Sequence, residues 1–431
     1  MNHILSKSIL ILLSIVVFTS TIVAQQVTTY AGFNTGYIDG TVANAKFRSP
    51  FGLAFDASGN LFISDHLEDK IRKITPAGDV TTFAGSTTGF ADGTAFNAKF
   101  ESLGGIAFDA SGNLYVADII NARIRKISPF GDVSTFAGSG ELGYLDGAGS
   151  VAKFFTPYCI AFDPSGNLYV TDYNNHRIRK ISPSGQVSTF AGSGVQGNAD
   201  GNGIAAQFTR PTGIACDAIG NVYVTDFGNH RIRKITPAGE VSTLAGSTSG
   251  YTDGMGISAQ FNFPYGIMVD PLGNVFVTDY GNNVVRKITP AGLVSTVAGS
   301  GISGYADGDG TVAKFSGMYG IVMNAAGDLF IGDFDNHRVR KISMQAVTTG
   351  NLVSTQENSI TIYPSPATNS LTLKSTEEIT SFEVIDVTGQ KVQATLSSNN
   401  SIDISLLNEG MYYIKLQIAD RTEIHKFLKT N

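Results

Sequence analysis

The sequence predicts an all-β protein, in which a six-bladed β-propeller is followed by a small C-terminal β-sandwich. The first observation behind this prediction is a motif of the type Gly-Leu-Ala-Phe-Asp, which recurs six times at intervals of 53 or 54 residues. The second is that each repeat holds four short stretches rich in β-branched and aromatic residues, without helical periodicity. The third is composition, because 49 glycines and only 15% charged residues suit short strands joined by many turns.

The third repeat shows the order of the expected strands. Its motif is followed by a turn at 165–167, a strand at 168–172 and a strand at 177–181. A further turn leads to an outer strand at 187–192. One four-stranded unit cannot bury both faces, so six units are expected to stack radially into a closed ring. The six copies of the motif are Gly52–Asp56, Gly105–Asp109, Cys159–Asp163, Gly213–Asp217, Gly266–Asp270 and Gly320–Asn324.

The ring needs a closing strand. The outer-strand motif occurs first at residues 27–32, before any complete repeat, whereas the last repeat runs to Ile342 and then lacks a full copy. We therefore expect residues 27–32 to supply the outer strand of the last blade, within a propeller that covers residues 27–345. Residues 347–350 are a weaker competitor for that place.

Three segments of the repeats carry a family resemblance. Residues 172–181, 226–235 and 333–342 contain Asp, Asn-His-Arg and a following Ile-Arg-Lys-Ile or Val-Arg-Lys-Ile, and they resemble the NHL-repeat signature. The copies around His66 and Asn121 depart from it, as does the copy at 282–284, but their strand pattern is intact. The resemblance implies a propeller over residues 27–345. For function it implies less, because the family includes binding platforms, sensor domains and a few enzymes.

The N-terminus has the features of an export signal. Lys7 and the free amine precede an apolar run at 9–17, which is too short to span a bilayer comfortably. We expect residues 1–24 to form a signal peptide cleaved near Ala24. No second apolar stretch of the sequence is long enough to cross a membrane. The net charge of −6 argues against a nucleic-acid partner.

A connection of about 20 residues joins each outer strand to the next inner strand, which is long for a hairpin. It always carries an Asp-Gly pair, followed by Ala-Lys-Phe or Ala-Gln-Phe. We expect the aspartate to cap a turn and the phenylalanine to anchor the loop. The alternative is a calcium site in each blade, although calcium needs six to eight oxygen ligands and each loop offers one reliable carboxylate. The six aspartates are Asp39, Asp92, Asp146, Asp200, Asp253 and Asp307.

Each blade also carries an Arg-Lys pair, from Arg72-Lys73 to Arg340-Lys341. We expect a structural role on a strand, with the long stems covering apolar surface and the heads meeting carboxylates such as Asp172. The alternative is an anion-binding stripe.

Histidine and cysteine offer little chemistry. His176, His230 and His337 occupy equivalent places in different blades, so a shared metal ion is not expected. Cys159 and Cys216 replace residues of the inner-strand motif, and small buried fillers are expected rather than a redox pair.

The residue just before the inner-strand Gly or Cys breaks the repeat symmetry. In the six copies it is Phe51, Gly104, Tyr158, Thr212, Tyr265 and Tyr319. In a closed propeller these positions approach one mouth of the central channel, together with residues slightly upstream. We expect a binding ring that stacks on and hydrogen-bonds a peptide or glycan; the alternative is a loop that tolerates variation. The candidate ring consists of Phe51, Tyr158, Tyr265, Tyr319, Arg48 and Arg210.

The C-terminal region is expected to be a separate unit at 359–431, after a polar linker at 346–358. It reads as alternating strands, and its length of about 70 residues is near the small end of independently folding domains. The expected strands are 370–373, 381–387, 402–404 and 411–418, with turns at 388–390 and 408–410.

This unit resembles the C-terminal sorting domain of the type IX secretion pathway. The matching residues are 363–367, 386–390, 402–406, 410–413 and 426–428. The resemblance implies a Bacteroidetes-type cell, passage through the outer membrane and removal of the domain by a sorting protease. The mature protein would then be held on the cell surface or released. The alternative is an accessory adhesive β-domain.

Two classes of function remain for the propeller. The first, which we favour, is a non-catalytic module that binds protein, peptide or glycan, without a cofactor and as a monomer. The second is a metal-dependent lactonase, hydrolase or lyase with its site in the channel. Such a site needs acids, histidines or metal ligands at non-repeated positions. Those available are His66, Glu68, Glu101 and Asp309, which compose no recognisable constellation, so no catalytic residue is predicted.

Overall fold

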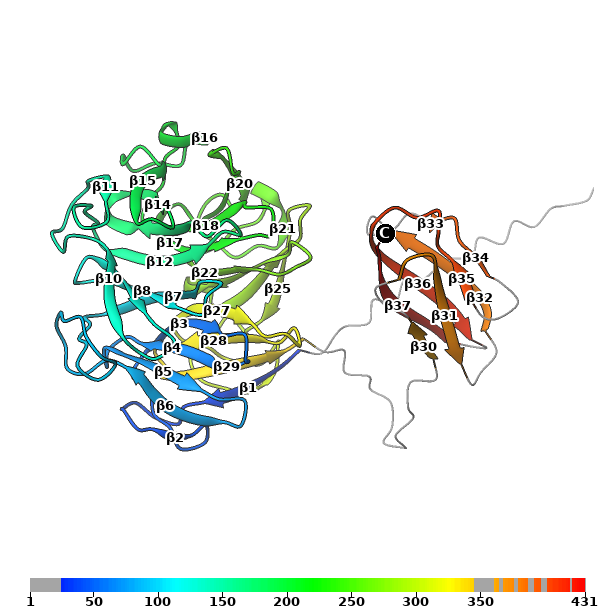
Figure 1. Cartoon of the computed structure of the whole chain (residues 1–431), viewed down its shortest axis with the longest axis horizontal. Coiled ribbons are helices and arrows are strands. Elements are labelled where there is room, and N and C mark those ends of the chain that lie inside the picture. Colours follow the sequence, from blue (N-terminus) through cyan, green and yellow to red (C-terminus); the bar gives the residue numbers. More distant parts are fainter. Residues whose placement is uncertain are drawn as a thin grey trace, which may run out of the picture. The chain divides into compact units, whose positions relative to one another are not determined.

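The computed structural model describes residues 25–344, 360–363, 367–375, 379–386, 391–396, 401–418 and 421–430. The predicted signal peptide, the linker at 346–358, the competing segment 347–350 and the turn at 388–390 lie outside the described residues. The chain divides into two compact units, Met1–Val347 and Thr348–Asn431, both drawn in Figure 1.

Six antiparallel sheets make up the described part of the first unit, and their strands fall into four positions. The inner strands are β3 (Pro50–Phe55), β7 (Leu103–Phe108), β12 (Pro157–Phe162), β17 (Pro211–Cys216), β22 (Pro264–Val269) and β27 (Met318–Met323). The second strands are β4 (Leu61–Asp65), β8 (Leu114–Asp118), β13 (Leu168–Asp172), β18 (Val222–Asp226), β23 (Val275–Asp279) and β28 (Leu329–Asp333). The third are β5 (Lys70–Ile74), β9 (Arg123–Ile127), β14 (Arg177–Ile181), β19 (Arg231–Ile235), β24 (Val284–Ile288) and β29 (Arg338–Ser343). The outer strands are β6 (Asp79–Ala84), β10 (Val133–Ala137), β15 (Gln186–Ala191), β20 (Glu240–Ala245), β25 (Leu293–Ala298) and β1 (Gln26–Ala31).

The inner strands form a closed ring. Each contacts the inner strands of the two neighbouring blades, and β27 contacts β3. In Figure 1 these six strands gather at the centre of the propeller, with the outer strands around them. Blades are numbered here from the first, which contains β3, to the sixth, which contains β27. The all-β propeller expected from the repeats is therefore the observed fold.

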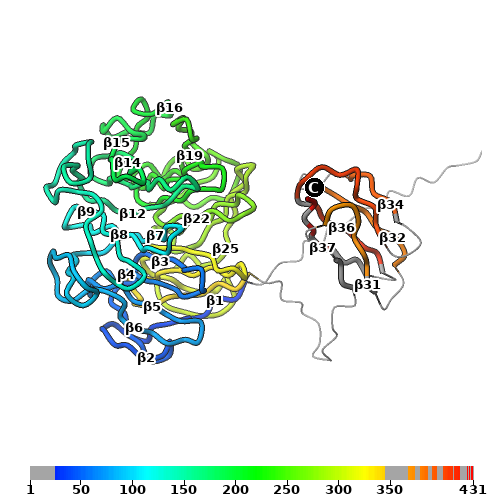
Figure 2. Tube along the Cα trace, in the orientation of Figure 1, coloured from blue at the N-terminus to red at the C-terminus, as the bar shows by residue number. Residues whose placement is uncertain are grey.

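The sixth blade takes its outer strand from the N-terminus. Strand β1 pairs with β29 in antiparallel register, with Val27 opposite Ile342 and Thr28 opposite Lys341. On its other side β1 pairs with β26 (Gly308–Asp309), where Val27 lies opposite Gly308. Figure 2 shows the blue N-terminal segment beside the yellow end of the propeller. The closing strand is thus held on both edges.

Five of the six sheets have a fifth, two-residue strand that the sequence pattern did not predict. It comes from the long connection, which folds back and pairs with the outer strand of the following blade, as Gly40 does with Val80. The second blade has instead a single bridge between Gly93 and Val133. These edge strands are β2 (Gly40–Thr41), β11 (Gly147–Ala148), β16 (Gly201–Asn202), β21 (Gly254–Met255) and β26.

Five short 3-10 turns complete the described elements of the propeller. Three of them, η1 (Tyr173–Asn175), η3 (Phe227–Asn229) and η5 (Tyr280–Asn282), follow second strands directly. The other two, η2 (Gly203–Ala205) and η4 (Gly256–Ser258), lie in the long connections.

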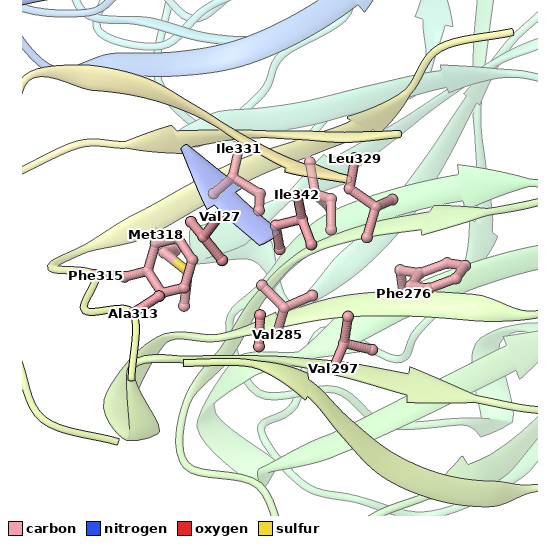
Figure 3. Close-up of a cluster of buried hydrophobic side chains, with 12 residues drawn as sticks. Val27, Phe276, Val285, Val297, Ala313, Phe315, Met318, Leu329, Ile331 and Ile342 are labelled. Atoms are coloured by element: carbon pink, nitrogen blue, oxygen red, sulfur yellow. The ribbon is translucent and has the colours of Figure 1, made fainter. Parts of the chain in front are cut away.

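The hydrophobic core lies between adjacent blades. One cluster joins the fifth and sixth blades and contains Val27, Phe315, Met318 and Ile342, each fully buried. Figure 3 shows Val27 of the blue strand β1 among these side chains. Removing β1 would therefore expose core as well as a sheet edge.

The second unit is a small sandwich of two four-stranded sheets, with strand orders β30-β31-β35-β34 and β33-β32-β36-β37. Leu371 and Ile402 of one sheet share a buried cluster with Val384 and Ile414 of the other. The long strand β37 was not predicted. The strands are β30 (Ile360–Tyr363), β31 (Ser370–Ser375), β32 (Ile379–Asp386), β33 (Lys391–Val392), β34 (Thr395–Leu396), β35 (Ser401–Asp403), β36 (Gly410–Ile418) and β37 (Arg421–Lys429).

Candidate functional site

The arginine of each Arg-Lys pair is buried, which corrects the expectation that its charged head lies at the surface. The Arg179 side chain is 0% exposed, so its head does not reach the surface over an apolar stem. Its guanidinium donates to Asp172 at 2.7 Å and to Asp146 at 2.5 Å, and it lies over the Phe154 ring. The expected contact with Asp172 is present, but the arginine ties the second and third strands to the long connection. The six buried arginines are Arg72, Arg125, Arg179, Arg233, Arg286 and Arg340.

The aspartates of the Asp-Gly pairs do more than cap a turn, because each accepts a hydrogen bond from the buried arginine of its blade. Asp146 accepts from Arg179 and from the backbone N–H and hydroxyl of Thr189. The Arg179 guanidinium thus forms an ion pair with this carboxylate. The partner Asp172 is fully buried, and desolvation raises its pKa to about 6 despite the opposing charge of Arg179. The repeated ionic residues therefore build the blades.

The three equivalent histidines link neighbouring blades. Nδ1 of His176 accepts from the backbone N–H of Arg210 at 3.1 Å, and Nδ1 of His230 accepts from that of Phe263 at 3.0 Å. His337 accepts from Ser49 at 3.2 Å, which joins the sixth blade to the first. Burial lowers the pKa of all three imidazoles. In the described part of the chain, no three side chains of His, Cys, Asp or Glu are grouped to hold a metal ion.

The four aromatic residues of the predicted ring meet on the channel axis. The Phe51 ring lies 5.3 Å from that of Tyr158, 5.9 Å from that of Tyr265 and 5.0 Å from that of Tyr319, between centroids. The Tyr265 hydroxyl donates to the Tyr158 hydroxyl, and burial raises the pKa of both. Phe51 is 1% exposed and Tyr265 is 4% exposed. These side chains form a packed plug, so Phe51 and Tyr265 are covered rather than presented to solvent.

A second layer of rings lies against this plug. Tyr173 stacks on Tyr158 at 5.1 Å, and Phe334 lies 4.2 Å from Tyr319. Each second-layer residue follows the aspartate that ends a second strand. The layer consists of the half-buried side chains His66, Tyr173, Phe227, Tyr280 and Phe334, which we name the aromatic face.

Apart from His66, these residues were not singled out from the sequence. A signal was nevertheless present, because the residue after that aspartate is Tyr or Phe in four of the six repeats. His66 donates from one ring nitrogen toward the carbonyl of Leu103, and its ring stacks on Phe51 at 5.5 Å. Burial lowers its pKa.

Both predicted arginines lie at this end of the channel. Arg48 has a 54% exposed side chain, with a guanidinium nitrogen 3.8 Å from the Glu68 carboxylate. The Arg210 guanidinium lies 5.9 Å from the centre of the Tyr173 ring. Glu101 also precedes an inner strand, and its backbone N–H donates to Asp118. Asp309 is in the edge strand β26, opposite Gln26, and does not join them.

Below the plug the inner strands approach one another closely. A Cβ added at Gly266 would lie 1.9 Å from the carbonyl oxygen of Tyr319, so only glycine fits there. Thr225 bridges two blades, because its hydroxyl accepts from the Gly213 N–H and donates to the Tyr265 carbonyl, both at 2.6 Å. The cavity beneath the plug measures about 70 Å³.

The two cysteines lie at different levels of the channel and are both free. Cys159 lines the small cavity, and burial raises the pKa of its thiol to about 12. Cys216 is the last residue of β17 and lies toward the other end of the channel, away from the plug. Burial raises the pKa of its thiol as well.

Comparison with known families gives matches in both parts of the chain. Residues 156–181 match the NHL repeat, and residues 193–361 match the teneurin NHL domain. Residues 361–430 match the secretion system C-terminal sorting domain. Within the described residues, no helix has the length and apolar character needed to span a bilayer.

Curated relatives align with about two thirds of this chain or more at low identity. Protein SUPPRESSOR OF QUENCHING 1 of Arabidopsis thaliana is 29% identical over 329 residues, which cover 71% of this chain and 31% of that protein. NHL repeat-containing protein 2 of Bos taurus is 26% identical over 333 residues, which cover 68% of this chain and 46% of that protein. The chain thus spans less than half the length of both relatives.

Solved structures show the same fold. A structural genomics protein of Bacteroides thetaiotaomicron superposes with a TM-score of 0.58 at 21% identity, over 74% of this chain and 76% of that one. An auxiliary nutrient binding protein of Bacteroides ovatus gives a TM-score of 0.58 at 20% identity, over the same shares of the two chains.

Proposed function

Because the chain is an NHL-repeat β-propeller followed by a secretion system C-terminal sorting domain, we propose that it is an exported binding module. Its ligand is a protein segment, a peptide or a glycan, held at the aromatic face of the propeller. The sorting domain indicates export by type IX secretion. In this proposal the mature protein is then held on the surface of a Bacteroidetes-type cell or released.

The observation that carries the proposal is the layering of aromatic rings at one end of the channel. Tyr173, Tyr280 and Phe334 are half-buried, so part of each ring is accessible while the rest packs on the plug. Rings held by packing lose little conformational entropy when a ligand binds. Each stacked partner contributes about 0.5–1.5 kcal/mol beyond area burial, which suits sugar rings and aromatic peptide side chains.

Charge at the aromatic face supports the same proposal. Arg48 and Arg210 place two guanidinium groups near the rings, one of them next to Glu68. Guanidinium groups hydrogen-bond hydroxyl and carbonyl oxygens, which glycans and peptides offer in number. Hydrogen bonds of this kind would fix the orientation of a ligand that stacking alone leaves free to slide.

The proposal assigns no catalytic step to this face. A general acid or base must reach the proton it transfers. His66 is packed between the Phe51 and Phe334 rings, 5.5 Å from each, and one ring nitrogen is engaged by the Leu103 carbonyl. Its surroundings are those of a packed side chain.

The test is a binding screen of the chain from Gln25 to Asn431 against peptide and glycan arrays, followed by titration of the best ligand. Tyr173→Ala together with Tyr280→Ala should weaken binding at least about ten-fold, as expected when central aromatic anchors are truncated. The matched control is Phe130→Ala, because Phe130 is 93% exposed in a turn at the opposite end of its blade. Equal affinity of the double variant and the control, or no array ligand at all, would count against the aromatic face.

A further inference from the structure

The channel has a second end, where the inner strands finish. There a depression of about 480 Å³ opens to solvent and is lined by residues of the second to the sixth blades. Its floor includes Ile160, Ile214 and Ile267, and its wall includes Cys216, Met268 and Met323. We name these six residues the open mouth.

The open mouth is a blind pocket. Ile160, Ile214 and Ile267 line both this depression and the small cavity below the plug, so they separate the two spaces. They belong to a ring of one aliphatic residue per blade, and all six are only 5–7% exposed. A ligand that enters from this end therefore meets an apolar floor. The ring consists of Leu53, Ile106, Ile160, Ile214, Ile267 and Ile321.

The blades differ at the residue that ends the inner strand. The first three carry phenylalanine, and each ring leans on an aromatic residue of the preceding blade, as Phe108 does on Phe62 at 5.0 Å between centroids. The last three carry Cys216, Val269 and Met323, which are smaller or more flexible. One position earlier, Met268 stands where the first four blades have alanine. The pocket wall on this side is thus built from thioether and aliphatic groups that adapt to a ligand.

The turns beside the pocket extend the same apolar side. Ile219 is 79% exposed and Leu272 is 60% exposed at the turns that follow the fourth and fifth inner strands. The first three blades have Ser58, Ser111 and Ser165 at this position. In the fourth and fifth blades Ile219 and Leu272 replace this serine, beside the methionines of the pocket. These two exposed side chains form an apolar rim on that side, which we call the apolar lip.

The pocket contains one polar side chain, and it breaks the repeat. Five blades have an aspartate at the turn after the inner strand, whereas the sixth has Asn324, which lines the pocket. In the other blades this aspartate accepts from an asparagine four residues later, but here that residue is Asp328, which pairs with Lys341 at 2.8 Å. Asn324 accepts through Oδ1 from the N–H groups of Ala326 and Asp328. Among the described residues no partner is found for its Nδ2, which leaves a donor at the pocket edge.

We propose that the open mouth binds an uncharged acyl compound, with its alkyl chain on the methionine side and its carbonyl oxygen accepting from Nδ2 of Asn324. The lining side chains carry no charge, so the site favours an uncharged ligand over an ionised one. The volume of about 480 Å³ and the single donor among apolar groups match the usual composition of small-molecule sites. This site is independent of the aromatic face at the other end.

The experiment uses the chain from Gln25 to Asn431 and N-phenyl-1-naphthylamine, an uncharged apolar fluorophore, as the probe. We expect saturable fluorescence with one site per chain, and displacement of the probe by methyl octanoate. Met268→Ser together with Met323→Ser should weaken both ligands at least about ten-fold, because apolar contact is lost. Asn324→Asp together with Asp328→Asn recreates the residue pair of the other blades and should weaken methyl octanoate about three- to ten-fold without affecting the probe.

Ile204→Ser, at a 69% exposed position of the 3-10 turn η2, is the matched control and should leave both affinities unchanged. Absence of saturable binding, unchanged binding in the methionine double variant, or equal loss in Ile204→Ser would overturn the proposal. So would a dimer in gel filtration that Leu272→Ser converts to a monomer, because the apolar lip would then be an interface between copies. Melting temperatures of all variants separate loss of the site from loss of the fold, and the Asn324 and Asp328 double variant keeps the test usable if the methionine variant does not fold.

Discussion

The two ends of the propeller channel are built from the same six strands, yet one is plugged and the other is open. At the plugged end, Phe51 and Tyr265 sit before the inner-strand glycines and their rings meet on the axis. At the open end, Met268 and Met323 line a depression of about 480 Å³ that opens to solvent. The strands keep one register throughout, so the contrast comes from one or two positions per blade. Repeat symmetry sets the frame, and departures from it decide which end is covered.

The two ends also differ in what holds them. Rings at the plugged end have aromatic partners on several sides, in geometries that stabilise beyond the area they bury. The open end is lined by aliphatic side chains, by two methionines and Cys216, and by Phe108 and Phe162, and it is open to solvent. The plugged end is therefore expected to carry stability, and the open end to tolerate substitution.

The largest expected effect breaks both ends at once, because they depend on one closed ring. Deleting residues 25–31 removes β1, exposes Ile342 and Met318, and opens the sheet of the sixth blade. We expect cooperative unfolding to be lost, or the melting temperature to fall by well over 10 °C, in scanning calorimetry. The comparison is the chain that begins at Gln25. An unchanged melting temperature would mean that another segment closes the ring.

The second effect sharpens the contrast in packing. Phe51→Ala removes a fully buried ring from the plug and should lower the free energy of unfolding by about 3–5 kcal/mol in urea. Leu272→Ala, at the 60% exposed lip of the open end, should change it by less than about 0.5 kcal/mol. Similar losses at the two sites would show that the plug is not a packed core.

The third effect isolates the polar contacts below the plug. Thr225→Val keeps the shape of the side chain but removes the hydroxyl between the Gly213 N–H and the Tyr265 carbonyl. Two buried backbone groups then lose a partner, which should cost about 1–3 kcal/mol of unfolding free energy. Ser242→Ala, on an exposed outer-strand site, is the control with an expected change near zero. If both variants unfold alike, the hydroxyl bridge adds nothing to the joint between the fourth and fifth blades.

The smallest effect is a pH dependence confined to the plugged end. Burial lowers the pKa of His66 below its ordinary value of 6.5, so the unfolded chain binds a proton that the folded chain resists. His66 therefore does not reduce the free energy of unfolding above pH 6.5, but it reduces it progressively as the pH falls below 6.5. His66→Phe removes the titration, so its melting temperature should rise relative to wild type between pH 7 and pH 5. A difference that stays constant over this range would contradict the assignment.

The sequence predicted the propeller well because its signals are local and repeated six times. The number of blades follows from the Gly-Leu-Ala-Phe-Asp spacing, and the orphan outer strand at 27–32 indicates where the ring must close. The fifth strands were missed because two residues such as Gly40 and Thr41 carry no strand pattern of their own. Their pairing depends on how the long connection folds back.

Sequence reasoning brought the four aromatic candidates together at one end of the channel but misjudged the exposure of Phe51 and Tyr265. Tyr158 and Tyr265 recur at a position that a closed ring brings to the axis, which topology alone predicts. Whether such rings stand apart or pack together depends on the channel diameter, which no single repeat reveals. The burial of Arg179 was missed because its second partner, the exposed Asp146, lies 33 residues away along the chain, and no local pattern links the two.

Because β1 closes the ring by pairing with β29, the order of the blades around the ring does not depend on where the chain begins. Gln26 lies opposite Ser343, so the chain enters and leaves the ring at neighbouring points. Proteins with adjacent termini commonly tolerate circular permutation at exposed loops. A gene that joined residue 344 to residue 25 and opened the chain at the exposed turn of Phe130 would encode the same six sheets. The blades that form the aromatic face and the open mouth would keep their neighbours, so the position of the chain break and the structure of the two channel ends are independent properties of this fold.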